Sequence, residues 1–156
     1  MKTGQRRKTI GEYRSMITVY ETRRIILRQK YTVGTDEYRK RIKLINQRLG
    51  TFKKGVRRLT VIKEKLHTIR KAIQEFIDID VRTTKFAQKK EGIQAKGIFF
   101  KFCMENGIPG NYPNDYVGNK SPHTASKIRT RFSLSFKVKP DNKELYHRFL
   151  TFMKDK

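Results

Sequence analysis

The chain has 156 residues, with 38 Lys or Arg against 14 Asp or Glu, and a formal net charge of +24 at pH 7. A compact domain with this much unbalanced charge repels itself unless a polyanion supplies counter-charge, and nucleic acid is the polyanion whose phosphates most often do so. A single cysteine, Cys103, excludes an internal disulfide framework, and no apolar run approaches the roughly 18 residues of a membrane-spanning helix.

The positive charge is spread along the whole chain. Residues 1–80 contain 22 basic and 8 acidic residues, and residues 81–156 contain 16 and 6. No detachable basic tail accounts for the excess, so we expect both halves to face the polyanion. Leu, Ile, Val and Phe together make 40 of the residues, a share above the roughly 20% below which charged chains stay disordered, so folding is expected.

The first predicted element is a helix from about Thr9 to Tyr31, where apolar residues recur near one face. Gly34, just beyond it, can adopt a left-handed conformation at no steric cost. Thr35 can then cap a second helix, and the acidic side chain of Asp36 suits the positive end of its dipole. The short connection predicts an antiparallel helical hairpin.

The second helix carries the most regular pattern in the chain. Its apolar residues step by four and three at Tyr38, Ile42, Ile45, Leu49, Phe52, Val56, Leu59, Ile62, Leu66, Ile69, Ile73 and Phe76. One extra step of three after Leu59 is a stammer, which overwinds a coiled coil locally. Gly50 and Gly55 lower helix propensity, so we expect a kink or break there.

Residues 1–77 are therefore predicted to form a basic helical hairpin, whose role the sequence leaves open. It is either a spacer or homodimerisation element with solvated charges, or a surface in direct contact with nucleic acid. An ordinary solvated coiled coil mixes its signs, whereas here cations far outnumber acids, which favours contact.

Residues 78–90 are predicted to be a basic linker, followed by a helix over 91–106 that Asn106 and Gly107 end. Pro113 is expected to open a very short helix that ends near Val117. No segment alternates like a half-buried strand, so the predicted class is all-α.

The next helix has the clearest start signal. Ser121 is a good N-cap and Pro122 is a favoured first residue, having no amide hydrogen to leave unpaired, which predicts a helix from Pro122 to about Phe136. After Pro140, Asp141 and Glu144 form a capping-box pattern for a last helix.

A short helix, a glycine-containing turn and a well-capped helix are the parts of a helix-turn-helix. In that motif the first turns of the second helix reach base edges in the major groove, where cations and small polar groups suit the hydrogen-bonding pattern. The candidate base-reading residues are Lys120, His123, Thr124, Ser126 and Lys127. The alternative is an ordinary solvent-facing helix in a small bundle.

When the signature Gly-Gly-Arg-Asp-His-Thr-Thr-Val is laid without gaps on residues 118–125, Gly118 and Thr124 are identical and Lys120 conservatively replaces the arginine. With the preceding helix and basic loop, they make residues 69–152 resemble the C-terminal DNA-binding domain of the bacterial replication initiator DnaA and of shorter phage proteins. Ser121 and Pro122 stand in place of the family's Asp-His pair, which helps to read its DNA box.

The resemblance implies binding of double-stranded DNA by residues 91–156, with the basic loop clamping phosphates. The candidate phosphate-binding residues are Lys85, Lys89, Lys90 and Lys96 from the resemblance, with Arg129 and Arg131 from the reading helix itself. The chain has no Gly-rich loop with Gly-Lys-Ser/Thr, so ATP-driven origin opening is not expected of it.

Catalysis is not expected, and neither is a cofactor or metal. The histidines His67, His123 and His147 are scattered without the spacing of a zinc site, and Asp78 and Asp80 are the only tight acidic pair.

The sequence therefore favours a non-enzymatic DNA-binding protein. The alternatives are a structural packaging protein, virion-internal or ribosomal-type, that reads no sequence and binds DNA or RNA, and an adaptor for an acidic protein partner. The basic N-terminus lacks the apolar segment of a secretory signal, so we expect a cytoplasmic protein of a bacterial or phage-infected cell, or a virion-internal one, without membrane contact.

Overall fold

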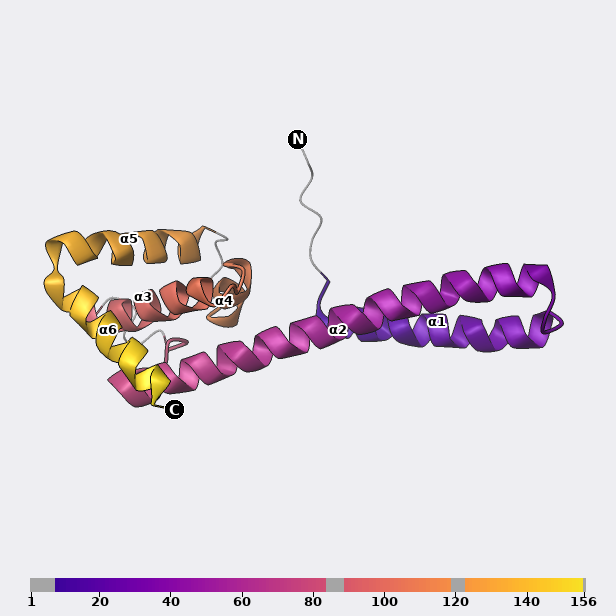
Figure 1. Ribbon diagram of the computed structural model, residues 1–156, viewed down its shortest axis with the longest axis horizontal. Coiled ribbons are helices and arrows are strands. Elements are labelled where there is room, and N and C mark those ends of the chain that lie inside the picture. The colour runs from indigo at the N-terminus through magenta and orange to yellow at the C-terminus, as the bar shows by residue number, and fades with distance from the viewer. Residues whose placement is uncertain (1–7, 84–88, 119–122, 156) are drawn as a thin grey trace, which may run out of the picture. The chain divides into compact units, whose positions relative to one another are not determined.

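The computed structural model describes residues 8–83, 89–118 and 123–155 (Figure 1). These ranges hold α-helices and no strand, which confirms the predicted all-α class. The helices are α1 (Ile10–Lys30), α2 (Asp36–Ile77), α3 (Lys90–Glu105), α4 (Asn111–Tyr116), α5 (Thr124–Val138) and α6 (Pro140–Lys154). Within the described ranges, none of these helices combines the length and apolarity needed to cross a membrane.

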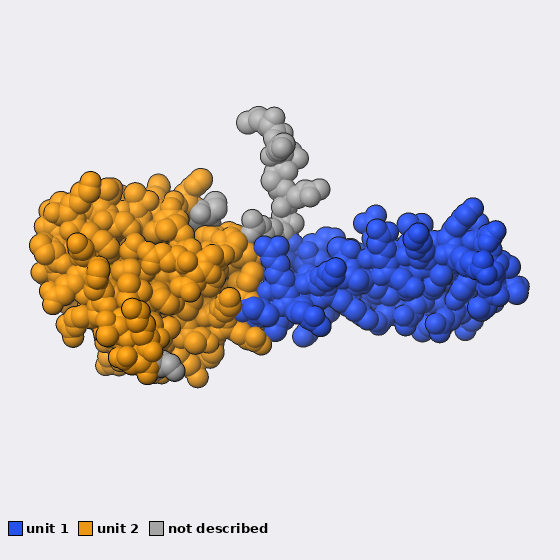
Figure 2. Space-filling model, in the orientation of Figure 1, with its two compact units in different colours: residues 1–61 blue, residues 62–156 orange. Residues whose placement is uncertain are grey.

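The chain forms two compact units, Met1–Val61 and Ile62–Lys156, coloured separately in Figure 2. The boundary lies inside α2 rather than at residue 77, where the sequence placed the end of the hairpin. The reason is that Leu66, Ile69 and Ile73, on the last turns of α2, are buried in the core of the second unit.

In the first unit, side-chain caps define both helix starts. Thr9 and Glu12 form a capping box at the start of α1, with the Thr9 Oγ1 accepting from the Glu12 amide at 3.2 Å. Thr35 accepts from the Tyr38 amide at 3.3 Å, as the N-cap that the sequence predicts for α2. Gly34 has φ +99°, the left-handed conformation expected of it in the turn.

Helices α1 and α2 lie side by side and run antiparallel (Figure 1). Tyr20 packs edge-on against Phe52 with ring centroids 5.4 Å apart, and the Arg41 guanidinium lies 5.0 Å from the Tyr31 ring. Nearer the start of α1, a Cβ on Gly55 would lie 2.9 Å from the Tyr13 ring, so the glycine permits this close approach.

Of the kink or break expected at the two glycines of α2, the break is wrong, because α2 runs without interruption from Asp36 to Ile77. Phe52 lies between Gly50 and Gly55 and is buried, with 6% of its surface exposed. Packing of this amphipathic face outweighs the roughly 1 kcal/mol that each glycine costs a helix relative to alanine.

The second unit encloses an aromatic core. Buried members come from the end of α2, the following loop and α3, α5 and α6, and they include Ile73, Val81, Ile98, Phe99, Cys103, Phe132, Tyr146 and Phe149. Phe149 of α6 packs edge-on against Phe102 at 5.3 Å and against Phe76 at 5.5 Å between ring centroids.

The start of the predicted linker is packed rather than free. After α2 ends, Asp78 adopts φ +59° and Val81 is 1% exposed in the core. Arg70 donates two hydrogen bonds to the Asp80 carboxylate, at 2.9 and 2.7 Å. This bidentate pair fixes the connection to α2.

Further boundaries differ from the sequence prediction. The short helix α4 begins at Asn111 with Gly110 at its N-cap, so the expected start at Pro113 is wrong. The expected cap at Ser121 and Pro122 lies outside the described residues, and α5 runs from Thr124 to Val138 with His123 at its N-cap. The capping box of Asp141 and Glu144 is wrong, because α6 begins at Pro140. Proline disfavours the helical conformation in the residue before it, and Lys139 is accordingly non-helical, with φ −128° and ψ 89°.

Candidate nucleic-acid interface

The predicted order of short helix, turn and longer helix is present in α4 and α5. Pro113 and Asn114 are buried and seat α4 on the core, and Tyr116 stacks on Phe99 with centroids 6.1 Å apart. Gly118 then leaves α4 with φ +72°, a conformation that side chains other than glycine rarely adopt.

One face of α5 is fixed tightly on α3. Ala125 and Phe132 are buried as the periodicity predicts, each 4% exposed, with Ile128 half-buried between them. A Cβ built on Gly97 of α3 would lie 2.3 Å from the Phe132 ring, so the two helices approach as closely as they do only because residue 97 lacks a side chain.

A chain of hydrogen bonds anchors the other end of α5. Gln94 donates to Asn142 at 2.6 Å, Asn142 donates to the Ser135 hydroxyl at 2.7 Å, and that hydroxyl donates to a carbonyl one turn earlier. The 7% exposed Asn142 thereby links α3, α5 and α6. Apolar packing and this network together set which residues of α5 face outward.

The structure brings four of the five candidate base-reading residues together on the first turns of α5. His123, Ser126 and Lys127 are exposed, and Thr124 is half-buried. The fifth, Lys120, lies outside the described residues. The first turn of α5 contains no acidic residue, so these donors stand in a positive field.

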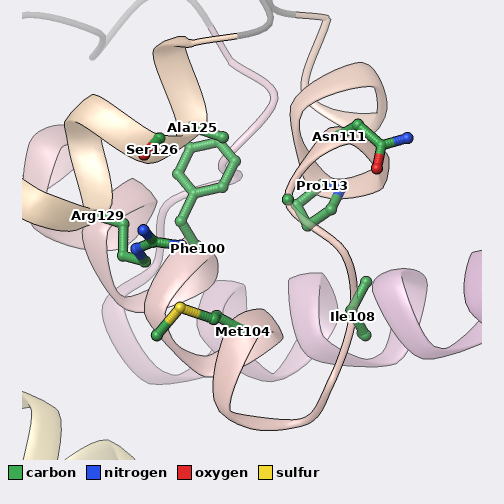
Figure 3. Close-up of a pocket in the computed structure, with 9 residues that line it drawn as sticks. Phe100, Met104, Ile108, Asn111, Pro113, Ala125, Ser126 and Arg129 are labelled. Carbon is green, nitrogen blue, oxygen red and sulfur yellow. The ribbon is translucent and has the colours of Figure 1, made fainter.

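The two arginines of α5 differ in their surroundings. Arg131 is exposed, one helical turn beyond Lys127. Arg129 is half-buried and lines a small cavity of ≈ 140 Å³ with Phe100, Met104 and other residues of α3 to α5 (Figure 3). Its packing there leaves Arg131 the better placed of the two for a phosphate.

The lysines from the predicted basic loop do not join the reading residues. Lys89 and Lys90 are exposed at the start of α3, and Lys96 is half-buried within it. Because Gly97 meets Phe132, whereas the end of α3 meets the start of α5, the two helices run antiparallel. The start of α3 therefore lies at the far end of α5. Its lysines are separated from the reading residues by roughly 12 Å or more, which is about the width of a major groove. Lys85 lies outside the described residues.

Two buried titratable groups of the second unit have raised pKa values. Burial raises the pKa of Cys103 to about 12, so its thiol stays protonated within the core. Tyr146 donates to Glu105, and burial together with this bond raises the pKa of the tyrosine. Across the described residues, no three His, Cys, Asp or Glu side chains are grouped to bind a metal ion.

The outer face of α5 extends beyond the residues that the sequence singled out. Leu134 and Val138 are 58% and 80% exposed there, and Lys137 is also exposed. From Tyr116 to Pro140 the sequence contains no Asp or Glu at all, a signal of local positive charge that was visible without a structure.

No family model matches the chain, and no curated protein or solved structure matches it either.

Proposed function

We propose that this protein is a non-enzymatic double-stranded DNA-binding protein that inserts α5 into the major groove. The observation that carries the proposal is the exposed, acid-free first part of α5, which follows a short helix and a left-handed glycine turn. The order of elements and the resemblance to the C-terminal domain of DnaA both support a helix-turn-helix.

In this proposal, residues at the start of α5 contact the DNA bases. Thr124, Ser126 and Lys127 offer hydroxyl and ammonium groups, which hydrogen-bond base edges in the major groove. The positive end of the helix dipole adds to the field at the same place, because the first turn of α5 has no acidic side chain to offset it. Arg131 would hold a phosphate, and Lys89 and Lys90 would hold phosphates at the other end of α5.

The hairpin supplies sequence-independent affinity. Over residues 8–61, 15 basic residues stand against 4 acidic ones, and all the basic ones except the half-buried Arg24 are exposed. Such a surface gains free energy by releasing counterions from phosphates. The same surplus favours a second candidate function, nucleic-acid packaging without sequence readout. The proposed location is the cytoplasm of a bacterial or phage-infected cell, or the inside of a virion.

The test is selection from a pool of random duplexes at several salt concentrations, followed by sequencing of the bound fraction. We expect a short motif to be enriched and to be lost in Thr124→Ala and Lys127→Ala. The matched controls Thr151→Ala and Lys143→Ala change exposed residues of α6 and should retain the motif.

Three results would contradict the proposal. Equal binding to all duplexes with a steep salt dependence, roughly −0.9 in log K per phosphate contacted, indicates packaging instead. If the protein prefers structured RNA to duplex DNA, α5 does not serve to read the major groove of DNA. If the protein binds neither DNA nor RNA, the result favours an acidic protein as the partner of the basic surface.

A further inference from the structure

The hairpin carries an apolar groove, and the proposed phosphate contacts leave its aliphatic side chains without a role. The α1–α2 groove, as we call it, has a volume of ≈ 350 Å³ and lies between the second half of α1 and the first part of α2. Its walls are formed by Arg23, Ile26 and Lys30 of α1 and by Arg41 and Leu44 of α2, and its floor includes Leu27 and Tyr31.

Apolar side chains stand open to solvent in both walls. Ile26 is 52% exposed and Leu44 is 62% exposed, on a unit whose surface is otherwise strongly basic. The floor residue Leu27 is buried, at 7% exposure. Exposed aliphatic groups that converge on a groove are typical of a surface that binds another molecule.

Cations flank the aliphatic residue of each wall. Arg23 and Lys30 lie about one helical turn to either side of Ile26, at positions i−3 and i+4 on the same face. Leu44 has Arg41 at i−3 and the exposed Arg48 at i+4. The pattern of one apolar residue between two cations is therefore repeated on both sides of the groove.

Two of these cations are held in place by aromatic residues of the groove. The Arg23 guanidinium lies 5.1 Å from the Tyr20 ring centroid, and that of Arg41 lies 5.0 Å from the Tyr31 centroid. Arg41 also bonds Glu37 at 2.5 Å, which raises the pKa of the arginine. Among the described residues that line the groove, none is acidic.

We infer that the α1–α2 groove binds an acidic amphipathic helix of another protein. The apolar stripe of such a helix would cover Ile26 and Leu44, and carboxylates on both sides of the stripe would meet the flanking cations. A duplex has phosphates but no apolar ridge to fill the groove. A second copy of this chain is disfavoured by charge, because Met1–Val61 contains 18 Lys or Arg and only 4 Asp or Glu. The inference is independent of DNA binding by α5.

The experiment measures binding of a fluorescent synthetic peptide to the full-length protein by anisotropy. The probe is a helix of roughly 16 residues, long enough to be stable, with leucines in one stripe and glutamates beside it. One control peptide has the same composition in scrambled order, and another has lysines in place of the glutamates. We expect only the acidic amphipathic peptide to bind.

Variants locate the site. Ile26→Asp and Leu44→Asp should each weaken peptide binding by about tenfold or more, as expected for the centre of an interface. Ile25→Asp is the matched control, because Ile25 is also exposed on α1 but does not line the groove. Circular dichroism checks that each variant keeps its helix content.

A second pair of variants tests the charges. Arg23→Glu with Lys30→Glu should also weaken binding about tenfold, whereas Arg14→Glu with Arg28→Glu, on another face of α1, should change it little. Both double variants change the net charge equally. Each pair also changes one cation in the last turn of α1, so the effects on the helix are matched.

Four results would overturn the inference. Equal binding of the scrambled peptide means that only general charge attraction is present, and equal binding of the lysine peptide means that charge plays no part. Self-association of the protein that Leu44→Asp abolishes assigns the groove to a second copy. Loss of duplex DNA binding in Leu44→Asp, with peptide binding intact, assigns the surface to nucleic acid.

Discussion

The Arg70–Asp80 pair shows how a single ion pair shapes the second unit. The side chains are 15% and 22% exposed, so water screens the pair only in part. The bonds from Arg70 hold the pKa of the Asp80 carboxyl below its ordinary value of 3.8. The pair also positions the chain so that Val81 reaches the core.

Replacing Asp80 with asparagine should destabilise the protein by about 1–3 kcal/mol, because Arg70 loses a charged partner while remaining largely buried. Since the folded state lowers the pKa of Asp80, the contribution is present above the ordinary pKa of 3.8 and is lost as the pH falls through the folded-state pKa. Urea unfolding at several pH values measures both effects.

The matched control is Asp36→Asn, whose ion pair with Arg39 is mostly exposed, at 87% and 71% of the two side chains. It should cost only a few tenths of a kcal/mol. A stability difference between wild type and Asp80→Asn that stays constant as the pH falls below 3.8 would contradict the role assigned to the carboxylate.

Helix packing in the second unit depends on how closely α3 approaches α5. The substitution Gly97→Ala would set a Cβ 2.3 Å from the Phe132 ring, and the buried ring has little room to move. We expect this variant to lower the free energy of unfolding by about 1–3 kcal/mol, the usual cost of overpacking. It should also weaken DNA binding, because α5 is displaced.

Gly50→Ala is the opposite case in the same chain. Nothing lies within 4 Å of a Cβ there, and the residue is in the interior of α2. Alanine should therefore raise stability by roughly 0.5–1 kcal/mol through helix propensity. Thermal unfolding of both variants gives the comparison, and a rise in Tm for both would show that the contact with Phe132 has no energetic cost.

Helices were predictable from the sequence wherever periodicity and a local cap agreed. The first helix, the cap at Thr35 and the inward face of Ala125 and Phe132 all follow from spacing and capping chemistry. The start of α6 was not predictable in this way, because Asp141 and Pro140 offered competing signals and the conformation of the residue before proline decided between them.

The candidate site was predictable only as a run of residues on one helix. Exposure of Ser126 and Lys127 follows from the periodicity of α5. Arg129 is half-buried because it lines a cavity with Phe100 and Met104, which lie far from it in sequence. Likewise, the distance between Lys89 and the reading residues is set by the antiparallel packing of α3 and α5, which no local pattern encodes.

The whole molecule combines a small core with charge well beyond what one reading helix requires. The second unit alone contains 20 basic and 10 acidic residues. The hairpin adds a larger imbalance without the exposed polar face of α5. If this charge contributes to DNA affinity, it must bind phosphates whatever the DNA sequence is. Recognition of a particular DNA sequence must then depend on α5.

These two roles can be separated in the full-length protein by Lys54→Gln, Arg57→Gln and Arg58→Gln together. All three side chains are exposed on α2, and they lie about 15 Å or more along the helix from Leu44 at the centre of the α1–α2 groove. If they contact phosphates, the slope of log K against log salt should become shallower by up to about 2.7, while the enriched DNA motif is unchanged.

The control variant, Arg14→Gln with Arg28→Gln on α1, shows whether any loss of charge has the same effect. A slope that the triple variant does not alter excludes these residues from the DNA contact, and a changed motif would mean that the hairpin takes part in reading the sequence.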